Sequence, residues 1–194
     1  MSVTKRVRIA GNARILSSRE SDNDLSVQEK GSNQMRIQDI NKIGVLGAGV
    51  MGGGIAQSAI QAGYNVIIRD LTLEICENAR DTILNSRFGF NNAVQMDKMS
   101  AEERDAAMER LSFTTDVNDL KDCDLIIEAI GGGEDGAIEN KPLKLQVWKE
   151  MDQVVKPEAV FASNTSMFTI ADLATVTGRK DRFIGMHLFS PANI

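Results

Sequence analysis

The chain has 194 residues, of which 42% are hydrophobic and 25% charged, a composition typical of a globular protein with one substantial core. Its formal net charge of -5 gives no general attraction to nucleic acid or to anionic membranes. No apolar run approaches the roughly 20 residues that a membrane-spanning helix needs. Two cysteines and one histidine offer neither zinc-ligand spacing nor a disulfide framework, so we expect no metal, free thiols and a reducing compartment.

Residues 1–40 differ in composition from the rest of the chain. The stretch 1–20 is basic up to its first acid, Glu20, with serines and alanines between the cations, and residues 21–38 are polar without apolar periodicity. We predict a basic and polar leader without a stable fold over 1–40, and a domain over 41–194. The leader permits a mitochondrial transit peptide, and equally a mobile segment or the remnant of an upstream domain. The cytoplasm is the expected compartment, with the mitochondrial matrix as the alternative.

From residue 42, strand-like and helix-like segments alternate. Apolar runs typical of buried strands cover 42–47, 64–70, 123–130, 159–164 and 182–189. Helical segments lie between them: one that stops at Gly63, and others at 71–90, 101–111, 143–155 and 169–176. A capping box at 100–103 opens the third of these helices. Continuous apolar strands that alternate with helices predict an α/β fold, a doubly wound parallel sheet covered on both faces.

A glycine pattern, G-x-G-x-x-G, follows the first predicted strand and opens the helix after it. Gly47 permits a tight turn, Gly49 lets the backbone approach a pyrophosphate, and Gly52 lets helix and strand pack closely. Glycines that serve only packing are the alternative, but an acid, Asp70, ends the next strand, as a Rossmann dinucleotide site requires. We expect Asp70 to bind the adenosine ribose and to repel a 2'-phosphate, which favours NAD over NADP. The predicted cofactor-binding turn is Gly47, Ala48, Gly49, Val50, Met51 and Gly52.

Three polar stretches follow later strands: 128–140, "SNTS" at 163–166, and "HLFSP" at 187–191, which holds the only histidine. In parallel sheets, ligand sites gather at the carboxyl ends of strands. A serine hydroxyl and an imidazole beside a nicotinamide suit alcohol oxidation, in which a base removes the hydroxyl proton while hydride leaves the carbinol carbon. Imidazole is suited to this because its ordinary pKa is about 6.5. For an isolated histidine such as His187, a structural role in a strand is the alternative.

Together these motifs resemble a known family. "IGVLGAGVMGGGIAQSAIQAGYNVIIRD", "IIEAI…EN", "FASNTSMFTIADLA" and "DRFIGMHLFSPANI" have the order and spacing of the NAD-binding domain of the 3-hydroxyacyl-CoA dehydrogenases. The 3-hydroxybutyryl-CoA enzymes and the dehydrogenase parts of fatty-acid oxidation complexes belong to this family. The similarity covers about 42–194. It implies NAD-dependent oxidation of (S)-3-hydroxyacyl-CoA to 3-oxoacyl-CoA, in fatty-acid or butanoate metabolism.

The resemblance implies roles for residues near the nicotinamide. Glu139 and Lys144, in the family's E-N-x-x-x-K stretch, match residues on the nicotinamide side of the cofactor. Ser166 matches the serine that contacts both substrate oxygen and cofactor, and His187 matches the catalytic base. Two alternatives remain open: Ser166 could cap the following helix, and Glu139 with Lys144 could form a surface pair. The loop 131–137 is longer than usual in the family, which could shift both of those residues.

Three further positions carry expectations from the resemblance. Ser86 matches a serine that touches the CoA moiety, although a plain solvated helix position is the alternative, and Lys98 is a candidate for the CoA phosphates. Ser190 stands where many members have asparagine three residues after the histidine. A serine there can still hydrogen-bond the carboxamide side of the nicotinamide, with shorter reach.

The family also has an acid about a dozen residues past the histidine, which orients the imidazole, and a helical C-terminal domain that covers the acyl-CoA. The sequence ends before either, so the resemblance predicts the cofactor-binding half of a two-part enzyme. Its expected partners are an acyl-CoA substrate, a helical domain or partner chain, and a second copy once that domain is supplied. The alternative is a module that binds NAD(H) but turns nothing over without a helical partner.

Two other enzyme classes fit less well. A β-hydroxyacid dehydrogenase of the 6-phosphogluconate type shares G-x-M-G but is disfavoured by Asp70 and by the stretches 163–166 and 187–191. A serine hydrolase would need a G-x-S-x-G elbow around its nucleophile and an acid in the usual order. The sequence offers neither around Ser166.

Overall fold

The computed structural model describes residues 36–132 and 139–193. The strands are β1 (Lys42–Leu46), β2 (Asn65–Arg69), β3 (Leu111–Thr114), β4 (Leu125–Glu128), β5 (Val160–Ser163) and β6 (Phe183–Gly185). The α-helices are α1 (Val50–Gln61), α2 (Leu73–Asn85), α3 (Phe90–Gln95), α4 (Ala101–Met108), α5 (Lys141–Val154) and α6 (Ile170–Ala174). Short 3-10 helices occupy η1 (Ile37–Asp39), η2 (Val117–Leu120) and η3 (Lys180–Arg182). Within the described ranges, no helix has the length and apolar character needed to cross a membrane.

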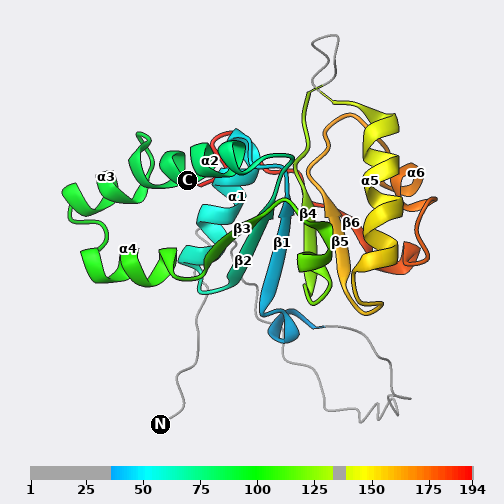
Figure 1. Cartoon of the computed structure of the whole chain (residues 1–194), viewed down its shortest axis with the longest axis horizontal. Helices are drawn as coiled ribbons and strands as arrows, with labels where there is room; N and C mark the ends of the chain where they lie inside the picture. The colour runs from blue at the N-terminus through cyan, green and yellow to red at the C-terminus, as the bar shows by residue number, and fades with distance from the viewer. Residues whose placement is uncertain (1–35, 133–138, 194) are drawn as a thin grey trace, which may run out of the picture. The chain divides into compact units, whose positions relative to one another are not determined.

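The strands form one sheet in the order β3-β2-β1-β4-β5-β6, and every pairing in it is parallel. Helices α1 to α4 lie on one side of the sheet in Figure 1, and α5 and α6 on the other. The prediction of a doubly wound parallel sheet is therefore confirmed. The strand order reverses between β1 and β4, and in such sheets a ligand binds in the crevice beyond the carboxyl ends of the strands at this point.

Both faces of the sheet are buried, which explains the continuous apolar runs of the strands. Successive strand residues point to opposite faces. Ile68 packs among residues of α1 and α2, whereas Ile67, one residue earlier, belongs to the core beneath α5. In that second core the Trp148 ring lies 4.8 Å from the ring of Phe161, measured between centroids. The sheet is thus packed between two apolar cores, one on each face.

The last strand is shorter than the predicted segment 182–189. β6 pairs with β5 only as far as Gly185, which lies opposite Ser163, and β5 ends there. The amide of Met186 still donates to the Ser163 carbonyl at 2.9 Å, but the chain then leaves the sheet. The expectation of a strand reaching to residue 189 is therefore wrong beyond 185. His187 lies in a loop, where its side chain is exposed.

Two predictions about the α2–β3 region also need correction, and two elements of this region were not predicted. The helix expected over 71–90 ends at Asn85, and Ser86 is its C-cap residue. A Cβ atom on Gly89 would lie 2.6 Å from the Leu84 carbonyl oxygen, and α3 begins directly after this close turn. The helix expected over 101–111 ends at Met108, which leaves room for β3. Neither α3 nor β3 was predicted, because both are short and each begins at the last residue of a predicted helix. The predicted leader falls outside the described residues except for 36–40, and its boundary stays a prediction.

Candidate active site

The glycine-rich turn between β1 and α1 has room for a ligand at one position only. Gly47 has φ of 99°, in the left-handed region that favours glycine. A Cβ atom on Gly52 would lie 1.8 Å from the Gly47 carbonyl oxygen, so turn and helix pack without space for a side chain. A Cβ atom on Gly49, in contrast, would meet no heavy atom of the described residues within 4 Å. The first and third glycines shape the turn, and the second leaves space for a diphosphate.

The surroundings of this turn fit the ADP half of a dinucleotide. Gly49 is the N-cap residue of α1 and has no side chain, so the first N–H groups of the helix remain available to an anion. Asp70, just past the end of β2, faces the turn: its carboxylate accepts hydrogen bonds of 2.6 Å from the amides of Ala48 and Leu71. The carboxylate predicted to bind a ribose is therefore held beside the backbone predicted to bind the phosphates.

A cavity of about 290 Å³ opens at the carboxyl ends of β4 and β5, beside the first turn of α1. Six of the residues predicted for the cofactor or for catalysis line it, although they come from distant parts of the sequence. They are Met51, Glu139, Lys144, Ser166, His187 and Ser190. The longer loop before Glu139 has not moved Glu139 and Lys144 away from the predicted site.

Lys144 lies buried between two carboxylates. Its side chain is only 3% exposed, so the alternative of a surface pair with Glu139 is wrong. The Nζ atom lies 2.5 Å from Glu128 Oε1 and 3.1 Å from Glu139 Oε2. The second contact is poorly aligned for a hydrogen bond, and we treat it as an ion pair. Paired carboxylates of this kind offset the hydration that a buried ammonium group loses.

Glu139 connects this buried pair to Ser166. Its Oε1 atom accepts a hydrogen bond from the Ser166 amide at 3.0 Å and one from the Ser166 hydroxyl at 3.3 Å. Burial raises the pKa of Glu139, but the Thr165 hydroxyl, the Ser166 amide and the charge of Lys144 outweigh burial and hold the pKa below its usual value. The turn before α6 is closed by the Thr165 hydroxyl, which accepts from the amides of 167–168. Ser166 is thus free of the capping role considered as its alternative.

His187 reaches the cavity from the loop after β6. The amide of its neighbour Leu188 donates to Asn164 Oδ1 at 2.7 Å, which ties this loop to the end of β5. The imidazole ring lies 4.9 Å from the ring of Phe189, measured between centroids. Among the residues that the structure describes, no carboxylate forms an ion pair with His187. Its orientation within this domain therefore rests on the backbone and on Phe189.

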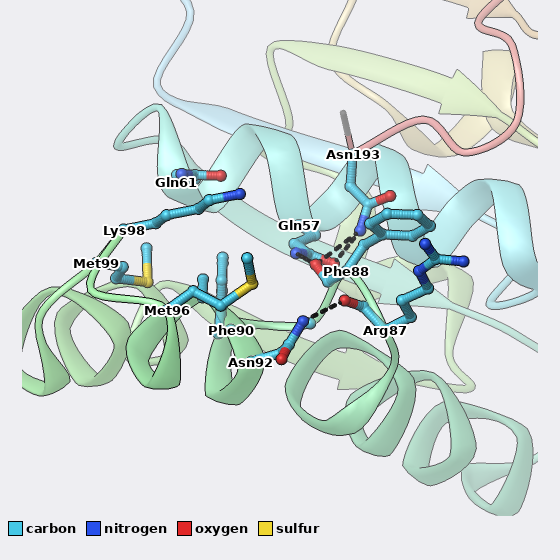
Figure 2. Close-up of a pocket in the computed structure, with 12 residues that line it drawn as sticks. Gln57, Gln61, Arg87, Phe88, Phe90, Asn92, Met96, Lys98, Met99 and Asn193 are labelled. Atoms are coloured by element: carbon cyan, nitrogen blue, oxygen red, sulfur yellow. Dashed lines mark hydrogen bonds between the residues drawn. The ribbon is translucent and has the colours of Figure 1, made fainter.

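The two residues predicted for CoA lie elsewhere. Ser86 is half-buried at the end of α2 and lines neither this cavity nor a second one of about 420 Å³ (Figure 2). Lys98 does line the second cavity, as does Arg87. One wall of it is held by Asn193, whose Nδ2 atom donates to Gln57 Oε1 at 2.7 Å.

Sequence reasoning missed Glu128 and the side chain of Asn164. Glu128 is completely buried at the end of β4, where its Oε1 atom also accepts from the Ile130 amide at 2.7 Å. The signal was present in the sequence: an acid that closes the apolar run 125–128 must be buried, and a buried acid needs partners. The partners themselves could not be read from the pattern, since Ser163 and Lys144 are 35 and 16 residues away.

Comparison with known proteins agrees with this geometry. The family model for the 3-hydroxyacyl-CoA dehydrogenase NAD-binding domain matches residues 42–194. A probable 3-hydroxybutyryl-CoA dehydrogenase of Deinococcus radiodurans is 41% identical over 150 residues, which are 77% of this chain and 50% of that protein. The crystal structure of Mycobacterium tuberculosis FadB2 has a TM-score of 0.71 and 38% identity, over 79% of this chain and 50% of the other. That of (S)-3-hydroxybutyryl-CoA dehydrogenase PaaH1 from Ralstonia eutropha has a TM-score of 0.71 and 37% identity, with the same coverage.

The chain thus spans about half the length of the relatives it matches. The matched half contains the glycine turn, the acid after β2 and the whole set of residues that line the first cavity. The chain therefore belongs to the 3-hydroxyacyl-CoA dehydrogenase family and carries its NAD-binding domain.

Proposed function

We propose that this chain supplies the cofactor site and the catalytic base of an enzyme that oxidises (S)-3-hydroxyacyl-CoA to 3-oxoacyl-CoA. One observation carries the proposal: His187 and Ser166 line the same cavity as Glu139 and Lys144, next to the first turn of the glycine helix. A nicotinamide reaching this cavity from the glycine turn would have an imidazole and a hydroxyl beside it. The names of the relatives, which are 3-hydroxybutyryl-CoA dehydrogenases, support the substrate class.

The residues divide the chemistry between them. Bound NAD⁺ supplies the acceptor for the hydride that leaves C3 of the substrate. His187 accepts the proton of the C3 hydroxyl and returns it in the reverse direction. Ser166 holds the same oxygen, and to do so its hydroxyl turns from Glu139 toward the substrate. The Ser166 amide keeps its own bond to Glu139 during this rotation, so the carboxylate stays in place.

The second cavity is our candidate for the CoA end of the substrate. Both cavities lie along α1: Met51 lines the first, and Gln57 lines the second, six residues or about 9 Å further along the helix. Lys98 and Arg87 line the second cavity, and both are cations that suit phosphate groups. The Arg87 guanidinium lies beside the Phe88 ring, away from Lys98 (Figure 2). A long thioester substrate would join two such sites.

The test is an assay of the 194-residue chain with acetoacetyl-CoA and NADH, in which turnover is measured as the loss of NADH absorbance. It is run with the chain alone and with a separately expressed C-terminal domain of the Deinococcus radiodurans relative. His187→Gln is the matched control, because the side chain is exposed and its replacement leaves packing intact. We expect turnover that His187→Gln lowers about 100-fold or more, given the usual value of general acid–base catalysis.

Turnover only in the presence of the added domain would favour the alternative of a cofactor-binding module that needs a partner. Turnover by the chain alone would exclude that alternative. NADH binding without turnover in either condition would contradict the dehydrogenase proposal and leave only cofactor binding.

A further inference from the structure

Glu128 is the most completely buried acid of the site, yet it lines no part of the cavity. Its Oε2 atom accepts a hydrogen bond from the Ser163 hydroxyl at 2.5 Å. Its Oε1 atom accepts from the Ile130 amide at 2.7 Å and from Lys144 Nζ at 2.5 Å. The three donors come from β5, from α5 and from the backbone just after β4, and together they hold both carboxylate oxygens of Glu128 in place.

Lys144 transmits this fixed position to the cavity. The Nζ atom that Glu128 holds is also 3.1 Å from Glu139 Oε2, and Glu139 receives both Ser166 bonds on its other oxygen. Of these residues, Lys144, Glu139 and Ser166 face the cavity, whereas Glu128 lies behind them. The contacts therefore form one chain from the core of the sheet to the expected nicotinamide end of the cofactor.

We infer that Glu128 is a positioning residue for the nicotinamide end of the cofactor site, acting through Lys144 on Glu139 and Ser166. When the negative charge of Glu128 is removed, Glu139 is the one carboxylate that still pairs with Lys144 among the contacts described above. The ammonium group of Lys144 then shifts toward Glu139. That shift changes the place of the two groups expected to meet the nicotinamide. The glycine turn and Asp70, which are expected to hold the ADP half, make none of these contacts. The inference rests on the proposed cofactor site.

Glu128→Gln is the first variant, since it keeps the shape of the side chain and removes its charge. The Ser163 hydroxyl can rotate to accept from the new amide, so the packing need not change. Binding of NADH and of ADP is measured separately by calorimetry on the whole chain. We expect the Kd for NADH to rise about tenfold, the lower end of what a lost hydrogen bond to a charged group costs. The Kd for ADP, which has no nicotinamide, should not change.

Two further variants separate positioning from folding. Lys144→Met and the double variant Glu128→Gln/Lys144→Met test whether Glu128 acts through Lys144: the double variant should bind NADH as weakly as Lys144→Met and no weaker. Asp152→Asn is the matched control. Asp152 pairs with the buried Arg179 at 2.7 Å, near the other end of α5 and about 12 Å along the helix from Lys144. The Asp152→Asn variant should have a lower Tm but the same Kd values for NADH and for ADP as wild type.

The outcomes are distinct. A Glu128→Gln variant that loses NADH and ADP affinity equally, or loses neither, would overturn the positioning role, and so would additive losses in the double variant. If Glu128→Gln does not fold by itself, the double variant still tests the route: a double variant that binds NADH more weakly than Lys144→Met would overturn the role of Glu128 through Lys144. A wild-type chain that does not bind NADH would instead contradict the proposed cofactor site itself, and this inference with it.

Discussion

The carbonyl oxygen of Gly47 occupies the space that a side chain at Gly52 would need. An added Cβ atom at Gly52 would lie 1.8 Å from that oxygen, well inside any contact that real Cβ atoms make. The oxygen belongs to the backbone of a turn whose φ of 99° already restricts it, so it cannot move aside at low cost. The turn and the first turn of α1 therefore depend on glycine at position 52.

We expect Gly52→Ala to destabilise the fold as a whole. Forcing an extra methyl group into closely packed surroundings costs about 3 kcal/mol at the upper end of the usual range. For a domain of this size that lowers the Tm by about 6–12 °C. Thermal unfolding monitored by circular dichroism measures the Tm of the variant and of wild type. An unchanged Tm would show that the turn can relax.

Gly49→Ala is the control for Gly52→Ala, because we expect it to weaken NADH binding more than it weakens the fold. The Cβ atom would enter space that no described residue occupies, so the Tm should fall only by the roughly 2–4 °C that alanine costs at an N-cap position, less than in Gly52→Ala. The same atom would stand where the diphosphate approaches the backbone, and we expect the Kd for NADH to rise about tenfold or more. Calorimetric titration measures it. Full NADH affinity in this variant would mean that the phosphates lie elsewhere.

Asp70→Asn should weaken NADH binding and reduce discrimination against NADPH. The carboxylate sits beside the glycine turn, held by the amides of Ala48 and Leu71. Loss of its charge weakens hydrogen bonds to the ribose, about tenfold in Kd, and removes the repulsion of a 2'-phosphate. Titrations with NADH and with NADPH give the ratio of the two Kd values, which measures the discrimination. Asp81→Asn makes the same charge change on the exposed face of α2 and should leave the ratio unchanged. A ratio equal to wild type in Asp70→Asn would assign ribose recognition to another residue.

Asp124 should make stability depend on pH in the acid range. Its carboxylate accepts from the amides of Asn41 and Lys42 at 2.7 and 2.8 Å and pairs with Lys156. Burial raises the pKa of Asp124, but Lys156 and the two amides outweigh burial and bring the pKa below 3.8. Because the folded-state pKa is the lower one, the stabilisation is complete above about 3.8 and is lost as the pH falls through the folded-state value.

The corresponding measurement is the free energy of unfolding in urea for wild type and Asp124→Asn across this range. We expect a large difference between them near neutral pH that shrinks steadily below the ordinary carboxyl pKa. Lys156→Met should reduce the same pH dependence. A difference independent of pH would mean that the amide of the variant, rather than its missing charge, is responsible for the destabilisation.

The two cysteines should be unreactive in the folded protein. Cys76 is 1% exposed and Cys123 is 0% exposed. Burial raises the pKa of Cys123 to about 11, so almost none of its thiol is ionised near neutral pH. Iodoacetamide should modify neither thiol in the native protein and both in denaturant, as counted by mass spectrometry. Rapid modification of the native protein would show that these cores open.

Local chemistry and the edge of the sheet at which the site gathers could be predicted from the sequence, but the individual long-range contacts could not. Gly47 and Gly49 act through the backbone geometry of one turn, and the carboxylate of Asp70 is placed by the end of one strand, so a motif and its spacing describe all three. The end of β6 depends instead on where its neighbour β5 stops pairing, which moved His187 from a predicted strand into a loop. The helix α3 and the edge strand β3 are short, and each begins at the last residue of a predicted helix, so neither was recognised as a separate element.

The alternation of strands and helices and the glycine turn were decided by the sequence alone, because both follow from backbone sterics and from the period at which apolar residues recur. That Glu139, Lys144, Ser166 and His187 gather at one edge of the sheet was expected from the strand ends and from the family resemblance. Only the tertiary structure decided that a buried Glu128 stands behind them and pairs with Lys144. Their contacts join strands and helices far apart along the chain, and the pairing of charges in a core is set by the register and packing of those elements.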